Sequence, residues 1–116
     1  MRLRMLAVAA GLAVSGPALA DYNLCVQLSG PQTYGVNIEI GGTGLWTPIT
    51  VQGQAPVCVR LNYFGAIRAR SVYATPVQSC GTVAAGNTAD VNLRASITEY
   101  SDNKNAPVQM TSCTRI

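Results

Sequence analysis

Alternation of apolar and polar side chains is the feature that most constrains what this 116-residue chain can fold into. Successive side chains of a strand point to opposite faces of a sheet, so a period of two predicts strands with one buried face. No stretch of ordinary helix length after residue 20 shows the 3.6-residue period of an amphipathic helix. The chain is therefore predicted to be all-β, with strands at 22–28, 36–40, 45–51, 57–63, 67–73, 91–97 and 107–116.

A hairpin is expected in the middle of the chain, between the strands at 57–63 and 67–73. A three-residue loop at 64–66 would place Leu61 opposite Ala69 and keep the apolar side chains of both strands on one face. A two-residue loop would instead set an apolar side chain beside an arginine. The burial pattern therefore favours the longer loop.

Turn signals separate the expected strands at regular intervals. Gly-Gly-Thr-Gly at 41–44 ends one strand, and Pro48 restricts the next strand to a sheet edge or a bulge. Residues 78–87 are rich in small side chains and predict a long connection. About seven short strands with such turns are typical of a small antiparallel β-sandwich of immunoglobulin-domain size. The Cys…Trp…Cys spacing of antibody domains is absent.

Residues 1–20 have the character of a secretory signal. Two arginines precede an apolar run at 5–14 that is too short to cross a bilayer, and Ala18-Leu19-Ala20 fits the cleavage pattern. We therefore expect a single exported domain at 21–116, either periplasmic or extracellular. Six basic and five acidic side chains remain in it, for a net charge of +1. This balance favours neither nucleic acid binding nor insertion into a membrane.

Four cysteines in a small exported chain predict two disulfides, for which three pairings are possible. Cys25, Cys58 and Cys113 fall on the more polar face of their strands, which predicts disulfides near the solvent face or at a sheet edge. A buried disulfide between two sheets is not expected. We favour Cys25–Cys58 with Cys80–Cys113, because both strands of the first pair carry cysteine on the polar face.

The cysteine spacing also contains a hidden regularity. Both favoured pairs are separated by 33 positions, and shifting residues 25–61 onto 80–116 gives eight identities in 37 positions. One interpretation is an internal two-fold repeat, in which a duplicated strand-turn-strand unit packs on its copy. The alternative is coincidence between two β-rich segments.

The chain lacks the residues that several kinds of catalytic and metal-binding site require. The chain has no histidine, which removes the commonest general base and most zinc or copper ligand sets. Glu39 and Glu99 could form a pair of catalytic carboxylates, but surface ion pairing with arginine is the simpler reading of both. The cysteines lack C-x-x-C spacing, and no glycine-rich loop opens a helix. We therefore expect no catalytic residues, no metal site and no cofactor.

Binding residues are expected on the central hairpin. Its register would place Arg60 opposite Arg70, with Arg68 on the same outward face, and like charges facing each other are unfavourable unless an anion lies between them. These arginines therefore predict a surface for an anion or an acidic partner. The alternative is a solvated face neutralised by Glu39 or Glu99.

The aromatic residues offer a second binding hypothesis. Trp46 lies beside a predicted turn, and together with some of the five tyrosines it could form a platform for stacking a sugar or contacting a protein. The alternative is that this single tryptophan belongs to the core. The polar loop at 101–106 is expected to be exposed.

The sequence predicts a non-catalytic interaction module, such as an accessory subunit of a cell-envelope or secreted assembly, whose partner is another protein or a surface glycan. Two other functions fit the same residues. A carbohydrate-binding domain would use Trp46, and an inhibitor or immunity-type protein would block a secreted enzyme through the loop Ser101–Ala106. No motif is specific enough to assign the chain to a family.

Overall fold

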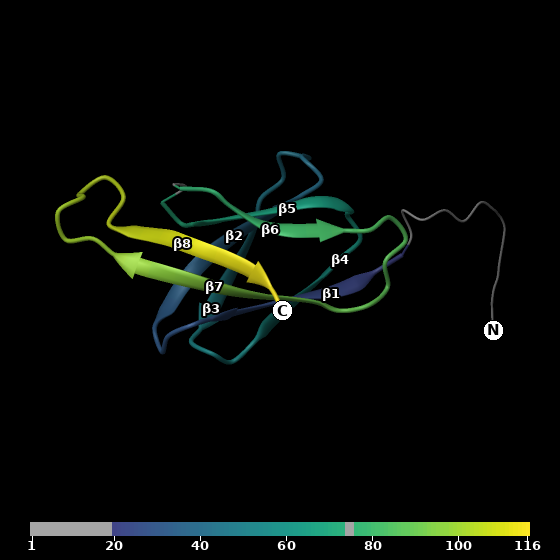
Figure 1. Ribbon diagram of the computed structural model, residues 1–116, viewed down its shortest axis with the longest axis horizontal. Coiled ribbons are helices and arrows are strands. Elements are labelled where there is room, and N and C mark those ends of the chain that lie inside the picture. Colours follow the sequence, from purple (N-terminus) through teal and green to yellow (C-terminus); the bar gives the residue numbers. More distant parts are fainter. Residues whose placement is uncertain (1–19, 74–75) are drawn as a thin grey trace, which may run out of the picture.

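The structure is a computed structural model that describes residues 20–73 and 76–116. The predicted signal sequence lies outside these residues, apart from Ala20. Within them the chain forms two four-stranded sheets with the strand orders β4-β1-β7-β8 and β3-β2-β5-β6 (Figure 1). The eight strands are β1 Tyr22–Leu28, β2 Thr33–Ile40, β3 Thr47–Gln52, β4 Val57–Leu61, β5 Gly65–Ser71, β6 Gln78–Val83, β7 Val91–Glu99 and β8 Val108–Arg115.

The predicted all-β sandwich is confirmed, with eight strands rather than about seven. All neighbouring strands pair antiparallel except β1 and β7, which run parallel in the middle of their sheet. The strand β3 lies at a sheet edge, as Pro48 predicted, because proline cannot donate a hydrogen bond to a second neighbour.

The core lies between the two sheets and uses the apolar half of each alternating pattern. Each fully buried aliphatic side chain contributes about 1.5–3 kcal/mol relative to an exposed one. The largest buried aliphatic side chains are Leu24, Val26, Leu28, Val36, Ile38, Ile40, Val51, Ile67, Val83, Leu93 and Met110. The side chains at the other positions of each pattern face outward, away from the core. The candidate binding residues are among them.

The predicted central hairpin is wrong. The strand β4 pairs with β1, and β5 pairs with β2 and β6 in the other sheet, so residues 62–64 cross from one sheet to the other. Two strands that each bury one face satisfy the same alternation whether they lie side by side or face each other across the core. At this crossing the backbone of Gly65 has a φ of 117°, and a Cβ there would come within 2.8 Å of the Gly41 Cα.

The strand β6 is missing from the sequence prediction, which placed a connection at 78–87. It pairs with β5 through a register shift between Ile67 and Arg68, so its buried residues Cys80 and Val83 are three positions apart instead of two. The irregularity removes the alternation by which strands are recognised. Only residues 84–87 and the few that follow belong to a connection.

The favoured disulfide pairing is confirmed. Cys25 and Cys58 lie directly opposite each other on β1 and β4, on the outward face of their sheet. Cys80 and Cys113 join β6 to β8, which run beside each other at the edges of the two sheets (Figure 1). This second pair lies at a sheet edge, as expected, but it also links the two sheets, which was not expected.

A bulge explains why Cys113 faces inward. Ser96 pairs with Ser112 but Ile97 pairs with Met110, so Thr111 is an extra residue in β8. The extra residue reverses the alternation after Met110 and turns Cys113 toward the core side, against Cys80. The two cysteine pairs thus have different surroundings despite their equal spacing, and the internal repeat stays a prediction.

Side-chain hydrogen bonds also join the two sheets. The Tyr34 hydroxyl on β2 donates to the Glu99 carboxylate on β7, and the Ser71 hydroxyl on β5 donates to the Val108 carbonyl oxygen over 2.7 Å. The bond to Glu99 is the main cause that raises the pKa of Tyr34 to about 12. The exposed Glu99 carboxylate is therefore bonded to Tyr34 and does not neutralise an arginine.

Removing either disulfide by paired Cys→Ser substitution should lower the free energy of unfolding by about 3–4 kcal/mol, since both close loops of the same 33-residue separation. The two variants should differ in hydrogen exchange. Loss of Cys80–Cys113 frees the sheet edge, so the amides of β6 should lose protection, whereas loss of Cys25–Cys58 should leave β6 protected. Equal exchange of β6 in both variants would contradict this placement.

Stability should also fall at high pH because of Tyr34. The pKa of this group in the fold, about 12, exceeds its ordinary value of 10.0, so its stabilising effect is complete below pH 10 and is lost as the pH rises through 12. Urea unfolding between pH 9 and 12 should show a smaller fall for Tyr34→Phe than for wild type. The exposed Tyr73→Phe is the control and should behave as wild type.

Candidate functional site

Two arginine side chains cover the indole ring of Trp46 on the outward face of the β3-β2-β5-β6 sheet. The Arg70 guanidinium carbon lies 3.7 Å from the ring centroid, and that of Arg68 lies 5.5 Å from it. Both distances are within the range of cation–π attraction. We call Trp46, Arg68, Arg70 and the neighbouring Glu39 the arginine–tryptophan site.

Strand register places these side chains together. On β5 the inward positions Ile67 and Ala69 belong to the core, so Arg68 and Arg70 point outward. The neighbouring strand β2 sets Glu39 opposite Arg68 and Asn37 opposite Arg70. Residues 41–46 then return the chain to the start of β3, which brings Trp46 back over the same face.

A buried carboxylate holds this loop in place. Glu39 lies on the outward face of β2, yet its side chain is only 3% exposed. One of its oxygens accepts a hydrogen bond from Arg68 Nε over 2.9 Å, and the other accepts from the Gly44 backbone amide over 2.7 Å. Gly44 has a φ of 76°, a conformation that favours glycine. The glycine-rich turn is thus folded over Glu39, and Arg68 is neutralised there as one alternative predicted.

Among the residues that the structure describes, Arg70 differs from Arg68 in having no acidic partner. Within residues 20–73 and 76–116, Arg70 forms no ion pair, and its Nε is buried without a hydrogen-bond acceptor. The guanidinium is half-buried against the indole ring. It is therefore a positive charge that is fixed in position while its hydrogen-bonding capacity is incompletely used.

The structure brings together three of the four residues expected to bind, Trp46, Arg68 and Arg70, but not Arg60. Because the predicted hairpin does not form, Arg60 lies on β4 in the other sheet. It is exposed there, 4.0 Å from the Asp21 carboxylate and 3.4 Å from the Asn23 side-chain oxygen. The predicted surface of three arginines is therefore wrong, and two of them form a site with a tryptophan that the sequence treated separately.

The aromatic residues do not form one platform. Trp46 is half-buried outside the core, so the core alternative does not hold for it, and one face of its ring is covered by Arg70. Tyr22 is buried between the sheets and Tyr34 is bonded to Glu99. A sugar would have to use the other indole face or displace Arg70.

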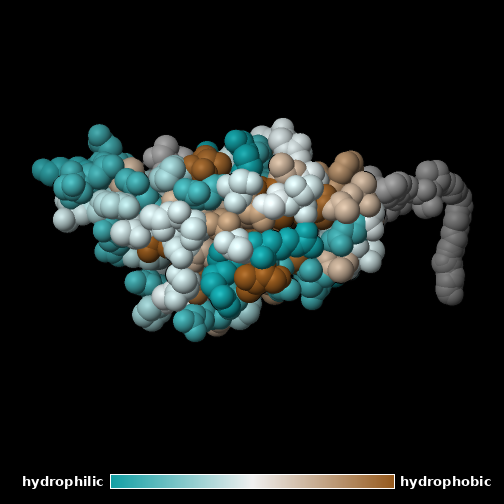
Figure 2. Space-filling model, viewed as in Figure 1, coloured by the Kyte–Doolittle hydropathy of each residue, from teal (hydrophilic) through white to brown (hydrophobic). Residues whose placement is uncertain are grey.

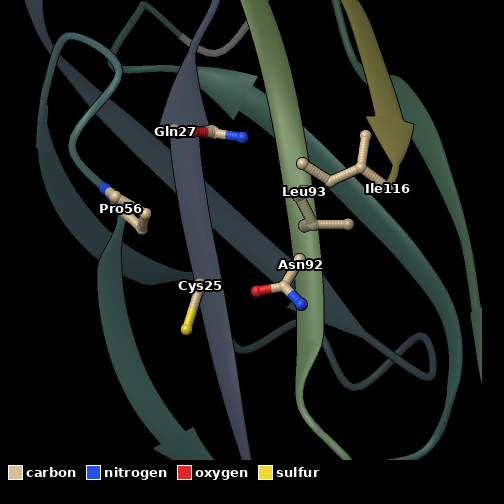
Figure 3. A pocket seen from close by; sticks show the side chains of 6 residues that line it. All are labelled: Cys25, Gln27, Pro56, Asn92, Leu93 and Ile116. Atoms are coloured by element: carbon tan, nitrogen blue, oxygen red, sulfur yellow. The ribbon is translucent and has the colours of Figure 1, made fainter.

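A shallow hollow of about 330 Å³ lies on the outward face of the opposite sheet. Figure 3 shows Gln27 on β1 and Asn92 on β7 between Pro56 on one side and Ile116 on the other. A second hollow adjoins it at Gln27 and is lined by Ser29, Gln54 and Arg94. Several polar groups here bond to one another, as Ser29 does to the Ser96 hydroxyl and Gln54 to the Ser29 carbonyl oxygen. Neither hollow contains an aromatic side chain.

Large apolar side chains are exposed in small groups. The face seen in Figure 2 is mainly polar, with separate apolar spots. Across the described residues, the exposed large apolar side chains are Leu45, Tyr63, Phe64, Val72, Tyr73, Val77, Tyr100 and Ile116. In the same part of the chain, no three potential metal-ligating side chains cluster closely enough to hold an ion. No helix among these residues is long and apolar enough to span a membrane.

The sequence matches no protein-family model and no curated protein. Among solved structures, the membrane-binding domain of pneumolysin is similar to 66% of this chain over 86% of its own length, with 10% identity and a TM-score of 0.33. This likeness is too weak to support an argument about fold or function.

Substitution of the two partners in the Glu39–Arg68 pair should have unequal effects. Arg68→Gln leaves a buried carboxylate with one hydrogen bond, and it should lower the free energy of unfolding by about 3 kcal/mol. Glu39→Gln leaves only the half-exposed Arg68 unpaired, and it should cost about 1 kcal/mol. Urea unfolding measures both values, and an equal or reversed order would contradict the role of Glu39 as the buried member.

Proposed function

We propose that this chain is an exported, non-catalytic binding module that recognises an acidic protein partner through the arginine–tryptophan site. The observation that carries the proposal is Arg70, which is stacked 3.7 Å above Trp46 and forms no ion pair among the described residues. The proposal keeps the interaction-module function expected from the sequence and specifies the chemistry of its partner.

Geometry supports Arg70 as the recognition residue. A guanidinium binds a carboxylate through two parallel hydrogen bonds, and stacking on an aromatic ring restricts its motion before binding. Less conformational entropy is then lost when the partner arrives. Exposed carboxylates on a protein surface are the simplest ligands for such a group.

The local charge supports an acidic ligand. Arg68 and Arg70 contribute two positive charges to the site, and Glu39 contributes one negative charge that is buried and already used by Arg68. The remaining positive charge lies on the outward face, where a partner can reach it. Rim charges of this kind accelerate association as well as adding affinity.

Separate observations support the two other parts of the proposed function, which are export and the lack of catalytic activity. Two disulfides in a small domain are consistent with an oxidising compartment, and the sequence begins with residues typical of a secretory signal. The arginine–tryptophan site contains neither a nucleophile nor a histidine base, and its one carboxylate is occupied by two hydrogen bonds. These features suit binding better than chemistry.

The single tryptophan provides a direct test. A short peptide of alternating aspartate and glycine should change the fluorescence of Trp46 on binding in low salt, and the matching asparagine peptide should not bind. Arg70→Gln should weaken binding of the aspartate peptide by about tenfold or more, as expected for loss of a charged hydrogen-bonded pair.

Arg60→Gln is the matched control, because it removes the same charge from an exposed position in the other sheet. It should weaken binding by less than about twofold, through long-range charge alone. Equal weakening by both substitutions would show that only net charge matters. Absence of binding by wild type, or equal binding of both peptides, would overturn the proposal.

A further inference from the structure

We infer that the acidic segment of the partner also carries an aromatic or leucine side chain, which enters a hollow beside Phe64. This inference rests on the proposed function and adds the second chemical feature of the ligand. The hollow has a volume of about 410 Å³ and is lined by Gly41, Thr43, Asn62, Tyr63 and Phe64. We call it the Phe64 hollow.

The hollow has the size and composition of a site for one anchoring side chain. Its volume falls within the roughly 300–1,000 Å³ typical of ligand pockets. Phe64 is 51% exposed and Tyr63 is 37% exposed, so two aromatic side chains at one place are only partly covered by this chain. Exposed aromatic residues around a hollow favour an apolar anchor from a partner.

The hollow and the arginine–tryptophan site share the same two segments. The turn after β2 supplies Gly41 and Thr43 to the hollow and ends at Trp46. The segment that enters β5 supplies Phe64 and continues to Arg68 and Arg70. One partner segment can therefore contact both places without crossing another element.

Backbone contacts fix the two places relative to each other. The Gly41 amide donates to the Ala66 carbonyl oxygen over 2.9 Å. A Cβ on Gly41 would lie 2.4 Å from the Phe64 carbonyl oxygen, so the turn and the crossing segment approach as closely as glycine allows. The spacing between hollow and arginines is thus part of the fold, and a ligand must match it.

This spacing defines the ligand. Phe64 and Arg70, the group that meets the carboxylate, are six positions apart on nearly extended chain, which corresponds to about 20 Å. A partner segment in an extended conformation would span this distance with about five residues between the apolar side chain and the carboxylates. The ligand class is therefore an extended acidic peptide segment with an apolar residue about six positions away.

Charge argues for this occupant over two others. A second copy of the chain is a poor match, because three of its five carboxylates are engaged by Arg68, Tyr34 and Arg60. The other two, Asp90 and Asp102, have no acidic neighbour in the sequence and so form no acidic segment. An anionic membrane surface usually attracts a cluster of basic side chains, whereas this site has one arginine without an acidic partner among the described residues. An acidic peptide needs only one well-placed guanidinium.

The test compares peptides that share two aspartates and differ in a phenylalanine. The aspartates and the phenylalanine are separated by spacers of about one, five and nine residues of glycine and serine. Affinity, measured through Trp46 fluorescence, should be about tenfold higher for the five-residue spacer than for the peptide without phenylalanine, and lower for the other spacers.

Variants of the protein test whether the gain in affinity from the phenylalanine arises in the Phe64 hollow. Asn62→Phe fills the hollow without adding a second tryptophan to the fluorescence signal, and Phe64→Ser removes its exposed wall. Each should abolish the gain from phenylalanine while leaving binding of the purely acidic peptide unchanged. Ile116→Ser is the matched control, since Ile116 is 53% exposed but lies by the opposite sheet, and the gain should persist.

The outcomes separate the two proposals. If the acidic peptide binds through Arg70 but phenylalanine adds nothing at any spacing, this inference fails and the proposed function stands. If no acidic peptide binds, both fail. Binding of wild type to anionic phospholipid vesicles with no preference among the peptides would identify a membrane surface as the ligand and overturn the inference.

Discussion

Burial of two apolar sheet faces against each other is the constraint on which the rest of this structure depends. Most strands direct alternate side chains into the common core, with Leu24 and Val36 as fully buried examples. The other half must face outward, where polar side chains are free to interact with one another or with a partner. The disulfide between Cys80 and Cys113 joins the edges of the two layers and strengthens this arrangement.

A single carboxylate then organises one outward face. Glu39 is buried on the face where the turn after β2 folds back. Its carboxylate accepts hydrogen bonds from Arg68 Nε and from the Gly44 amide, and the second of these holds the turn in place. The same turn places the Trp46 ring against the side chains of Arg68 and Arg70. Arg68, which belongs to a structural ion pair, and Arg70, the candidate binding group, thus lie on the same face of β5. They differ because a carboxylate, that of Glu39, already faces Arg68.

The sequence predicted the parts of the fold that depend on local pattern. The strand Tyr22–Leu28 agrees with the prediction residue for residue, because its alternation is uninterrupted and both its ends are marked. The strand β6 and the inward orientation of Cys113 were missed, because in each case a register irregularity breaks the alternation. Pairing between β4 and β5 was predicted wrongly, because alternation says which face is buried but not which strand lies alongside.

The candidate site was predicted as a set of residue types but not as an arrangement. Arg68 and Arg70 share a face because they are two positions apart, which the sequence shows directly. Their contact with Trp46 depends on the pairing of β2 with both β3 and β5, which no local pattern contains. The signal available beforehand was the glycine-rich turn after Glu39, which ends next to the tryptophan.

The central claim is that Arg70 is the group that meets an acidic ligand. The most direct measurement is an NMR titration of the arginine Nε–H signals of the domain with an aspartate-rich peptide. The account predicts that the signal of Arg70, whose Nε has no acceptor among the described residues, changes most, and that the signals of Arg60 and Arg94 change little. Small and equal changes in all arginine signals would show non-specific attraction and contradict the account.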